Sequence, residues 1–129
     1  MKLGKYNAHV ATSYGNIGNV YFRKKDYDRA IETHLIAKQI REKVFGKDTV
    51  VIVGSYRGLG NAYREKKSYK KSLDFFERVL RSRTVQLGPG HRDLAREYES
   101  IGEVYSLMGN KLKAEEYKVK AEEIGKQSE

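Results

Sequence analysis

The eight residues YGNIGNVY at 14–21 return as YRGLGNAY at 56–63 and as YESIGEVY at 98–105. Successive copies are 42 residues apart, and the first tyrosine, the glycine in fifth place and the last tyrosine are kept each time. Self-similarity at a fixed step of roughly 20 to 50 residues is typical of proteins that stack small structural units in a row. The sequence therefore predicts three repeats, which we place at about 8–47, 48–89 and 90–127.

The spacing within the first repeat predicts a helix. Tyr14, Ile17, Gly18 and Tyr21 follow one another at steps of three and four residues, so they share one face of an α-helix. We expect this helix to run from about residue 8 to residue 24. The long apolar runs of a membrane helix and the strict alternation of a sheet are both missing from the sequence, so an all-α fold is expected.

A second helix completes each repeat as a helical hairpin. In the first repeat Asp26 is expected to cap its N-terminus and Gly46 to end it. The same plan predicts caps at Asp48 and Ser68 in the second repeat, and a turn at residues 109–110 in the third. The remaining helices are expected to end at about Glu65, Leu87, Leu107 and Gly125.

Glycine recurs inside the first helix of every repeat, at residues 18, 60 and 102. A glycine in a helix interior costs about 1 kcal/mol relative to alanine, so its repetition needs a reason in the packing. We expect a neighbouring helix to approach closely at each of them. Small residues recur in the second helices as well, at Ala30, Ser72 and Ala114.

The pattern resembles the tetratricopeptide repeat, on the glycines at 18, 60 and 102, the tyrosines three residues after them and the small residues in the second helices. The 42-residue step and the segments 9–13 and 40–46 resemble the longer repeat of kinesin light chains. The segments 59–63 and 30–34 also resemble spindle-orientation adaptors of the LGN/Pins type. This resemblance implies a right-handed α-α superhelix of three antiparallel helix hairpins.

Two features predict that the chain is a piece of a longer array. Gly4 aligns with Gly46 and Gly88, which end the first and second repeats, so a preceding repeat is expected. The last helix is more polar than its counterparts and has Lys118 where the second repeat has Phe76. A polar outer face is typical of the terminal helix of a repeat array.

The resemblance implies that the first helix of each repeat lines a concave face on which a partner protein binds. Asparagine amides there would hold the backbone of an extended peptide, and arginines would pair with acidic side chains of the partner. The alternative is that each of these is simply a solvated helix position. The candidate partner-binding residues are Thr12, Asn16, Asn19, Arg23, Arg57, Asn61, Arg64, Arg96, Glu99 and Glu103.

The net charge of +9 leaves a second function open. Residues 1–88 hold 19 lysines and arginines against 8 acidic residues, whereas residues 89–129 hold 7 against 9. A basic surface favours acidic partners of any kind, including a phosphate backbone. The leading hypothesis is a protein-binding scaffold for an acidic or extended peptide segment, and the alternative is a basic nucleic-acid-binding repeat protein.

Residues that carry enzymatic chemistry are missing from the pattern. The chain has no cysteine, and His9, His34 and His91 are too far apart to share a metal ion, so no metal or cofactor is expected. Neither glycine-rich segment, 15–18 or 58–60, precedes the Lys-Ser/Thr of a phosphate loop. We therefore expect no catalytic residues and no enzyme activity, and we expect a cytoplasmic protein without a membrane span.

Overall fold

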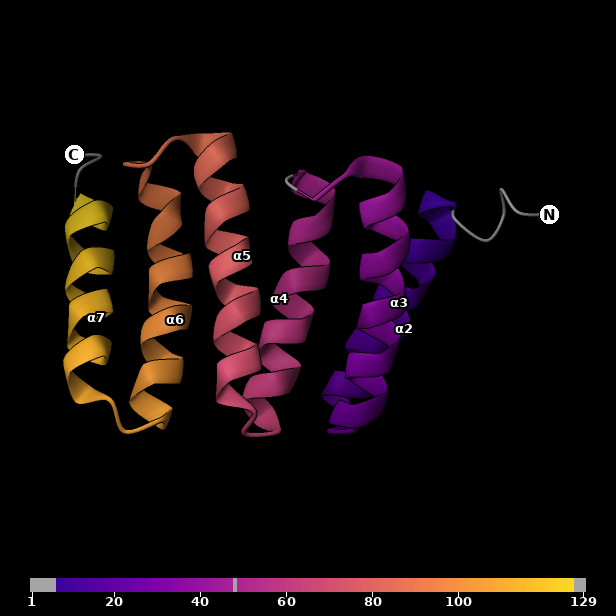
Figure 1. The fold of residues 1–129 in the computed structure, drawn as a ribbon, viewed down its shortest axis with the longest axis horizontal. Helices are drawn as coiled ribbons and strands as arrows, with labels where there is room; N and C mark the ends of the chain where they lie inside the picture. Colours follow the sequence, from indigo (N-terminus) through magenta and orange to yellow (C-terminus); the bar gives the residue numbers. More distant parts are fainter. Residues whose placement is uncertain (1–6, 48, 127–129) are drawn as a thin grey trace.

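A computed structural model describes residues 7–47 and 49–126 of the chain, and the described part folds into six α-helices and one short 3-10 helix. The α-helices stand side by side in the order of the sequence, with α2 and α7 at opposite ends of the row (Figure 1). The fold is the predicted all-α solenoid. The elements are α2 (Ala8–Arg23), α3 (Tyr27–Phe45), α4 (Val50–Glu65), α5 (Tyr69–Leu87), η1 (Arg92–Leu94), α6 (Ala95–Leu107) and α7 (Lys111–Lys126).

The helix ends follow the predicted capping in part. The Asp26 carboxylate accepts a hydrogen bond from the Arg29 backbone N–H at 3.2 Å, and Gly46 ends α3 with a φ of 90°. Ser68 stands at the N-cap of α5 as predicted, but its side chain makes no capping hydrogen bond. Thr49 is the N-cap residue of α4, while the predicted caps and repeat ends at Asp48 and Gly4 lie outside the described residues.

The core forms where neighbouring hairpins meet. One apolar cluster joins α3, α4 and α5 and contains Ile52 and Leu59, both fully buried. A second cluster joins α5 to α6 through Phe76 and Ile101. Tyrosine rings extend both clusters, and the ring of Tyr63 stacks on Phe75 with 5.8 Å between centroids. The ring contacts of the recurring tyrosines therefore join the two helices within a hairpin.

A neighbouring helix approaches each of the three recurring glycines closely, as predicted, and a Cβ atom added to Gly102 would lie 3.3 Å from the Tyr117 Cβ. A Cβ atom added to Gly60 would lie 2.8 Å from the Phe76 ring, and one added to Gly18 would lie 2.8 Å from the His34 ring. Gly58 faces the other side of His34, because its added Cβ would lie 2.7 Å from the same imidazole. His34 is thus enclosed between α2 and α4.

His34 is a buried titratable residue. His34 is 3% exposed, and its Nδ1 atom is buried without a hydrogen-bond partner among the described residues. Burial lowers the pKa of the imidazole below its usual value of 6.5, and the neighbouring Arg41 guanidinium lowers the pKa further. The imidazole is therefore held neutral in the folded chain.

This depressed pKa predicts a loss of stability in mild acid. The unfolded chain takes up a proton at His34 below about pH 6.5 while the folded chain resists it, so the free energy of unfolding falls as the pH drops below that value. The variant His34→Phe, which copies Phe76 of the second repeat, should remove the part of the pH dependence of the unfolding free energy that comes from His34. Urea unfolding at pH 7.5 and pH 5.5 measures it, and equal pH dependence in both proteins would contradict the expectation.

Candidate functional site

Four of the ten predicted binding residues lie on α2, and all four are exposed: Thr12, Asn16, Asn19 and Arg23. The Thr12 hydroxyl donates a hydrogen bond to the Ala8 carbonyl oxygen at 3.1 Å, so it is partly occupied within the helix. Among the described residues, neither asparagine side chain has a hydrogen-bond partner. Their amides can therefore accept and donate toward a ligand.

On α4, the three predicted residues are half-buried, and two of them are already engaged. Asn61 sits 42 residues after Asn19, and its amide has no hydrogen-bond partner among the residues described. The Arg64 guanidinium donates from Nε to the Glu65 carboxylate at 3.1 Å, and its Nη1 lies 3.7 Å from the Glu103 carboxylate. Arg57 is ion-paired to Glu97 of α6. Asn61 is thus the α4 residue whose polar group remains available.

On α6, Arg96, Glu99 and Glu103 are all exposed. The contact between Arg64 and Glu103 joins the second and third repeats on the predicted binding side. Glu103 occupies the same place in its repeat as Asn19 and Asn61 do in theirs. The row of equivalent positions therefore changes from neutral amides to a carboxylate toward the C-terminal end.

The carboxylate of Glu97 is the main charged group that the sequence did not single out. Its side chain is 1% exposed and lies between two arginines, Arg57 of α4 and Arg83 of α5. Arg83 Nε is 3.6 Å from Glu97 Oε2, while Arg57 Nη2 donates to the other oxygen. This Arg57–Glu97–Arg83 cluster connects three helices.

A signal for the contact between Arg83 and Glu97 exists in the repeat register. Arg83 lies 42 residues after Arg41, and Glu97 lies 42 residues after Ser55. Arg41 donates from Nη1 to the Ser55 hydroxyl at 2.9 Å, so both interfaces use an arginine that reaches into the next hairpin. The equivalence of these positions is visible in the full 42-residue repeat, although the recurring tyrosines and glycines do not point to it.

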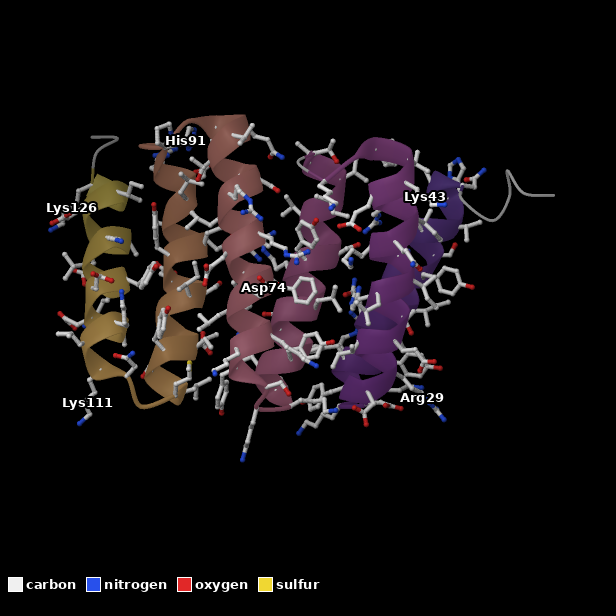
Figure 2. The ribbon with its side chains drawn as sticks, in the orientation of Figure 1. Arg29, Lys43, Asp74, His91, Lys111 and Lys126 are labelled. Atoms are coloured by element: carbon white, nitrogen blue, oxygen red, sulfur yellow. The ribbon has the colours of Figure 1, made fainter. Side chains whose placement is uncertain are left out.

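A surface hollow of about 580 Å³ lies between α6 and α7, and we call it the α6–α7 groove. Its floor is made of small residues, Gly102, Ala114 and Ala121. Figure 2 places Lys111 and Lys126 at opposite ends of α7, which forms one wall of the groove. The charged residues along its walls are Glu99, Glu103, Glu115, Glu122, Lys111 and Lys118.

The described residues contain neither a cluster suited to a metal ion nor a helix suited to a membrane. Within 7–47 and 49–126, no three histidine or carboxylate side chains gather closely enough to hold a metal ion. Over the same residues, no helix has both the length and the apolar character that crossing a membrane requires.

Comparison with known proteins points to one family. The family model described as "Tetratricopeptide repeat" matches residues 9–84 and again 52–127. No curated protein sequence matches this chain significantly. The crystal structure of BtubC (BKLC) from P. vanneervenii is similar over 93% of this chain and 48% of its own, with a TM-score of 0.84 and 22% identity. This chain thus spans about half the length of that protein.

A second similar structure is the TPR domain of Arabidopsis FLU. It aligns with 88% of this chain and 92% of its own length, with a TM-score of 0.76 and 20% sequence identity. At these identities both structures establish the shared helical fold.

Proposed function

Because the chain belongs to the tetratricopeptide repeat family, we propose that it is a non-catalytic scaffold that binds an extended segment of another protein along α2, α4 and α6. The family fold supports a role in protein–protein interaction. The three hairpins together offer a long surface on which a peptide can lie. On α2, few polar side chains are engaged in contacts within the chain. The binding mode along these helices is our proposal.

The observation that carries the proposal is the pair Asn19 and Asn61. They occupy the same place in successive repeats, and their amides have no hydrogen-bond partner among the residues described. A carboxamide offers both a donor and an acceptor, which matches the backbone of an extended peptide whatever its side chains. Two such amides at repeat spacing would hold a peptide in register.

The charge of the surface indicates the partner's chemistry. Arg23 is exposed at the end of α2, and the first 88 residues carry most of the positive charge of the chain. Toward α6, Glu99 and Glu103 are exposed carboxylates. We therefore propose a partner segment whose acidic part lies over α2 and α4, while any basic part lies over α6.

Replacing both amides by alanine tests the proposal. The variant Asn19→Ala with Asn61→Ala should bind the partner at least about tenfold more weakly, because two backbone hydrogen-bonding groups are lost. The partner would be isolated by pull-down from lysate with nuclease present, and affinities would be measured by titration calorimetry. The matched control is Gln39→Ala, an exposed amide on α3. Equal affinity of the double variant and the control would exclude this binding surface.

The positive charge of residues 1–88 also favours the second candidate, a nucleic-acid-binding repeat protein. The exposed lysines Lys66, Lys67, Lys70 and Lys71 gather at the turn into α5. Specific binding would keep the chain on an RNA or DNA column at physiological salt, whereas unspecific charge attraction would be lost at modest salt. Retention at physiological salt would favour this candidate over the protein scaffold.

A further inference from the structure

The outer side of α2 carries an apolar strip whose counterparts are buried elsewhere in the row. Ile17 is 46% exposed and Val20 is 41% exposed. The residues at the same places in the second and third repeats, Leu59, Ala62, Ile101 and Val104, are all 0% exposed. Leu59 and Ala62 share an apolar cluster with α3, and Ile101 and Val104 share one with α5. The strip on α2 has the composition of an interface between hairpins.

At the opposite end of the row, the α6–α7 groove is left uncovered by any further hairpin among the described residues. In the first two repeats a ring from the second helix, His34 or Phe76, covers the glycine of the first helix, and the next hairpin packs over it. In the third repeat Lys118 takes the place of that ring and is exposed, which leaves the α6–α7 groove open above Gly102. The groove is therefore the place on which, by repeat register, the first helix of a further hairpin would pack.

The charges at the two ends are complementary. The groove walls carry four glutamates against two lysines. Helix α2 contains no acidic residue, and Arg23, Lys24 and Lys25 stand at its end. Repeat register also places Lys118 opposite Asn16, whose amide oxygen can accept a hydrogen bond from an ammonium group. Electrostatic attraction of this kind guides two surfaces toward one orientation.

We propose that a second copy of this chain binds in the α6–α7 groove through its α2, so that the chains associate head to tail. The interface repeats the geometry of the internal α3–α4 and α5–α6 junctions, and α2 and α7 lie at opposite ends of the row (Figure 1). Because the two contacting surfaces differ, each dimer keeps one free end of each kind. Such an interface builds open chains that grow with concentration, rather than a closed pair.

The test uses the full chain and two double variants, each with one end altered. Ile17→Gln with Val20→Gln makes the α2 strip polar, and Glu115→Lys with Glu122→Lys turns the groove basic. All four positions are exposed, so circular dichroism should show unchanged helix content. The matched control is Val44→Gln with Val85→Gln, which changes exposed valines away from both ends.

Sedimentation velocity over a concentration series gives the expected results. The unaltered chain and the control should form oligomers of increasing size, while each end variant alone should associate at least about tenfold more weakly. An equimolar mixture of the two end variants should form dimers and nothing larger, because only one functional end of each kind remains. A monomeric unaltered chain, an unaffected end variant or a mixture without dimers would overturn the proposal.

Discussion

Glu97→Ala is expected to lower the free energy of unfolding by about 3–5 kcal/mol, because it leaves two arginines facing each other without their shared carboxylate. The Glu97 side chain is 1% exposed, and its carboxylate is the shared partner of both guanidinium groups. Arg83, which is 28% exposed, would remain in the gap between α5 and α6. Urea unfolding monitored by circular dichroism measures the change.

Two further variants separate the pairing from simple loss of volume. Glu103→Ala removes an exposed carboxylate from the same helix and should change the free energy of unfolding by no more than about 1 kcal/mol. The triple change Arg57→Met, Glu97→Leu and Arg83→Met should recover most of the loss, because apolar side chains of similar size often replace a buried ion-pair cluster without cost. A Glu97→Ala protein as stable as the Glu103→Ala protein would show that the Arg57–Glu97–Arg83 cluster does not stabilise the fold.

Phe76→Ala should cost about 3–5 kcal/mol of unfolding free energy, since it empties the space between Gly60 and the third repeat. Phe76 is 2% exposed, and it shares the apolar cluster of Leu73, Ile101 and Val104. The glycine opposite cannot fill the hole, because it has no side chain. Phe45→Ala is the control, as Phe45 is 39% exposed and should lose less than half as much. Comparable losses in both variants would contradict the role assigned to Phe76.

The 42-residue step predicted the helices well because the residues that repeat are those that pack. Gly18 and Gly60 recur since a ring must pass close to each helix, and this requirement is visible in the spacing alone. Helix ends at Gly46 and Leu87 were likewise predicted by residue type and register. Residues that are needed for packing therefore recur at a fixed step in the sequence.

The candidate site was less predictable because its charges do not repeat. Arg57 stands where the first repeat has Gly15 and the third has Glu99, so the register gave no reason to expect its pairing with Glu97. Asn19 and Asn61 do repeat, and the structure leaves both amides without partners among the described residues. Whether an arginine faces a ligand or a neighbouring helix depends on distances between repeats, which a sequence pattern does not contain.

Because the helices stand in a single row, the two junctions between hairpins determine the curvature of the molecule. The α3–α4 junction encloses a neutral imidazole between two glycines, whereas the α5–α6 junction combines the Phe76 ring with the Arg57–Glu97–Arg83 cluster. A small rotation at either junction changes the spacing between α2, α4 and α6, because the overall bend of such a stack is the sum of its local rotations. Both junctions carry polar contacts that oppose such a rotation: hydrogen bonds from Arg41 to Ser55 and from Tyr56 to Glu42 cross the first, and the Arg57–Glu97–Arg83 cluster crosses the second. The spacing of α2, α4 and α6 is therefore fixed by polar contacts at two junctions as well as by apolar packing.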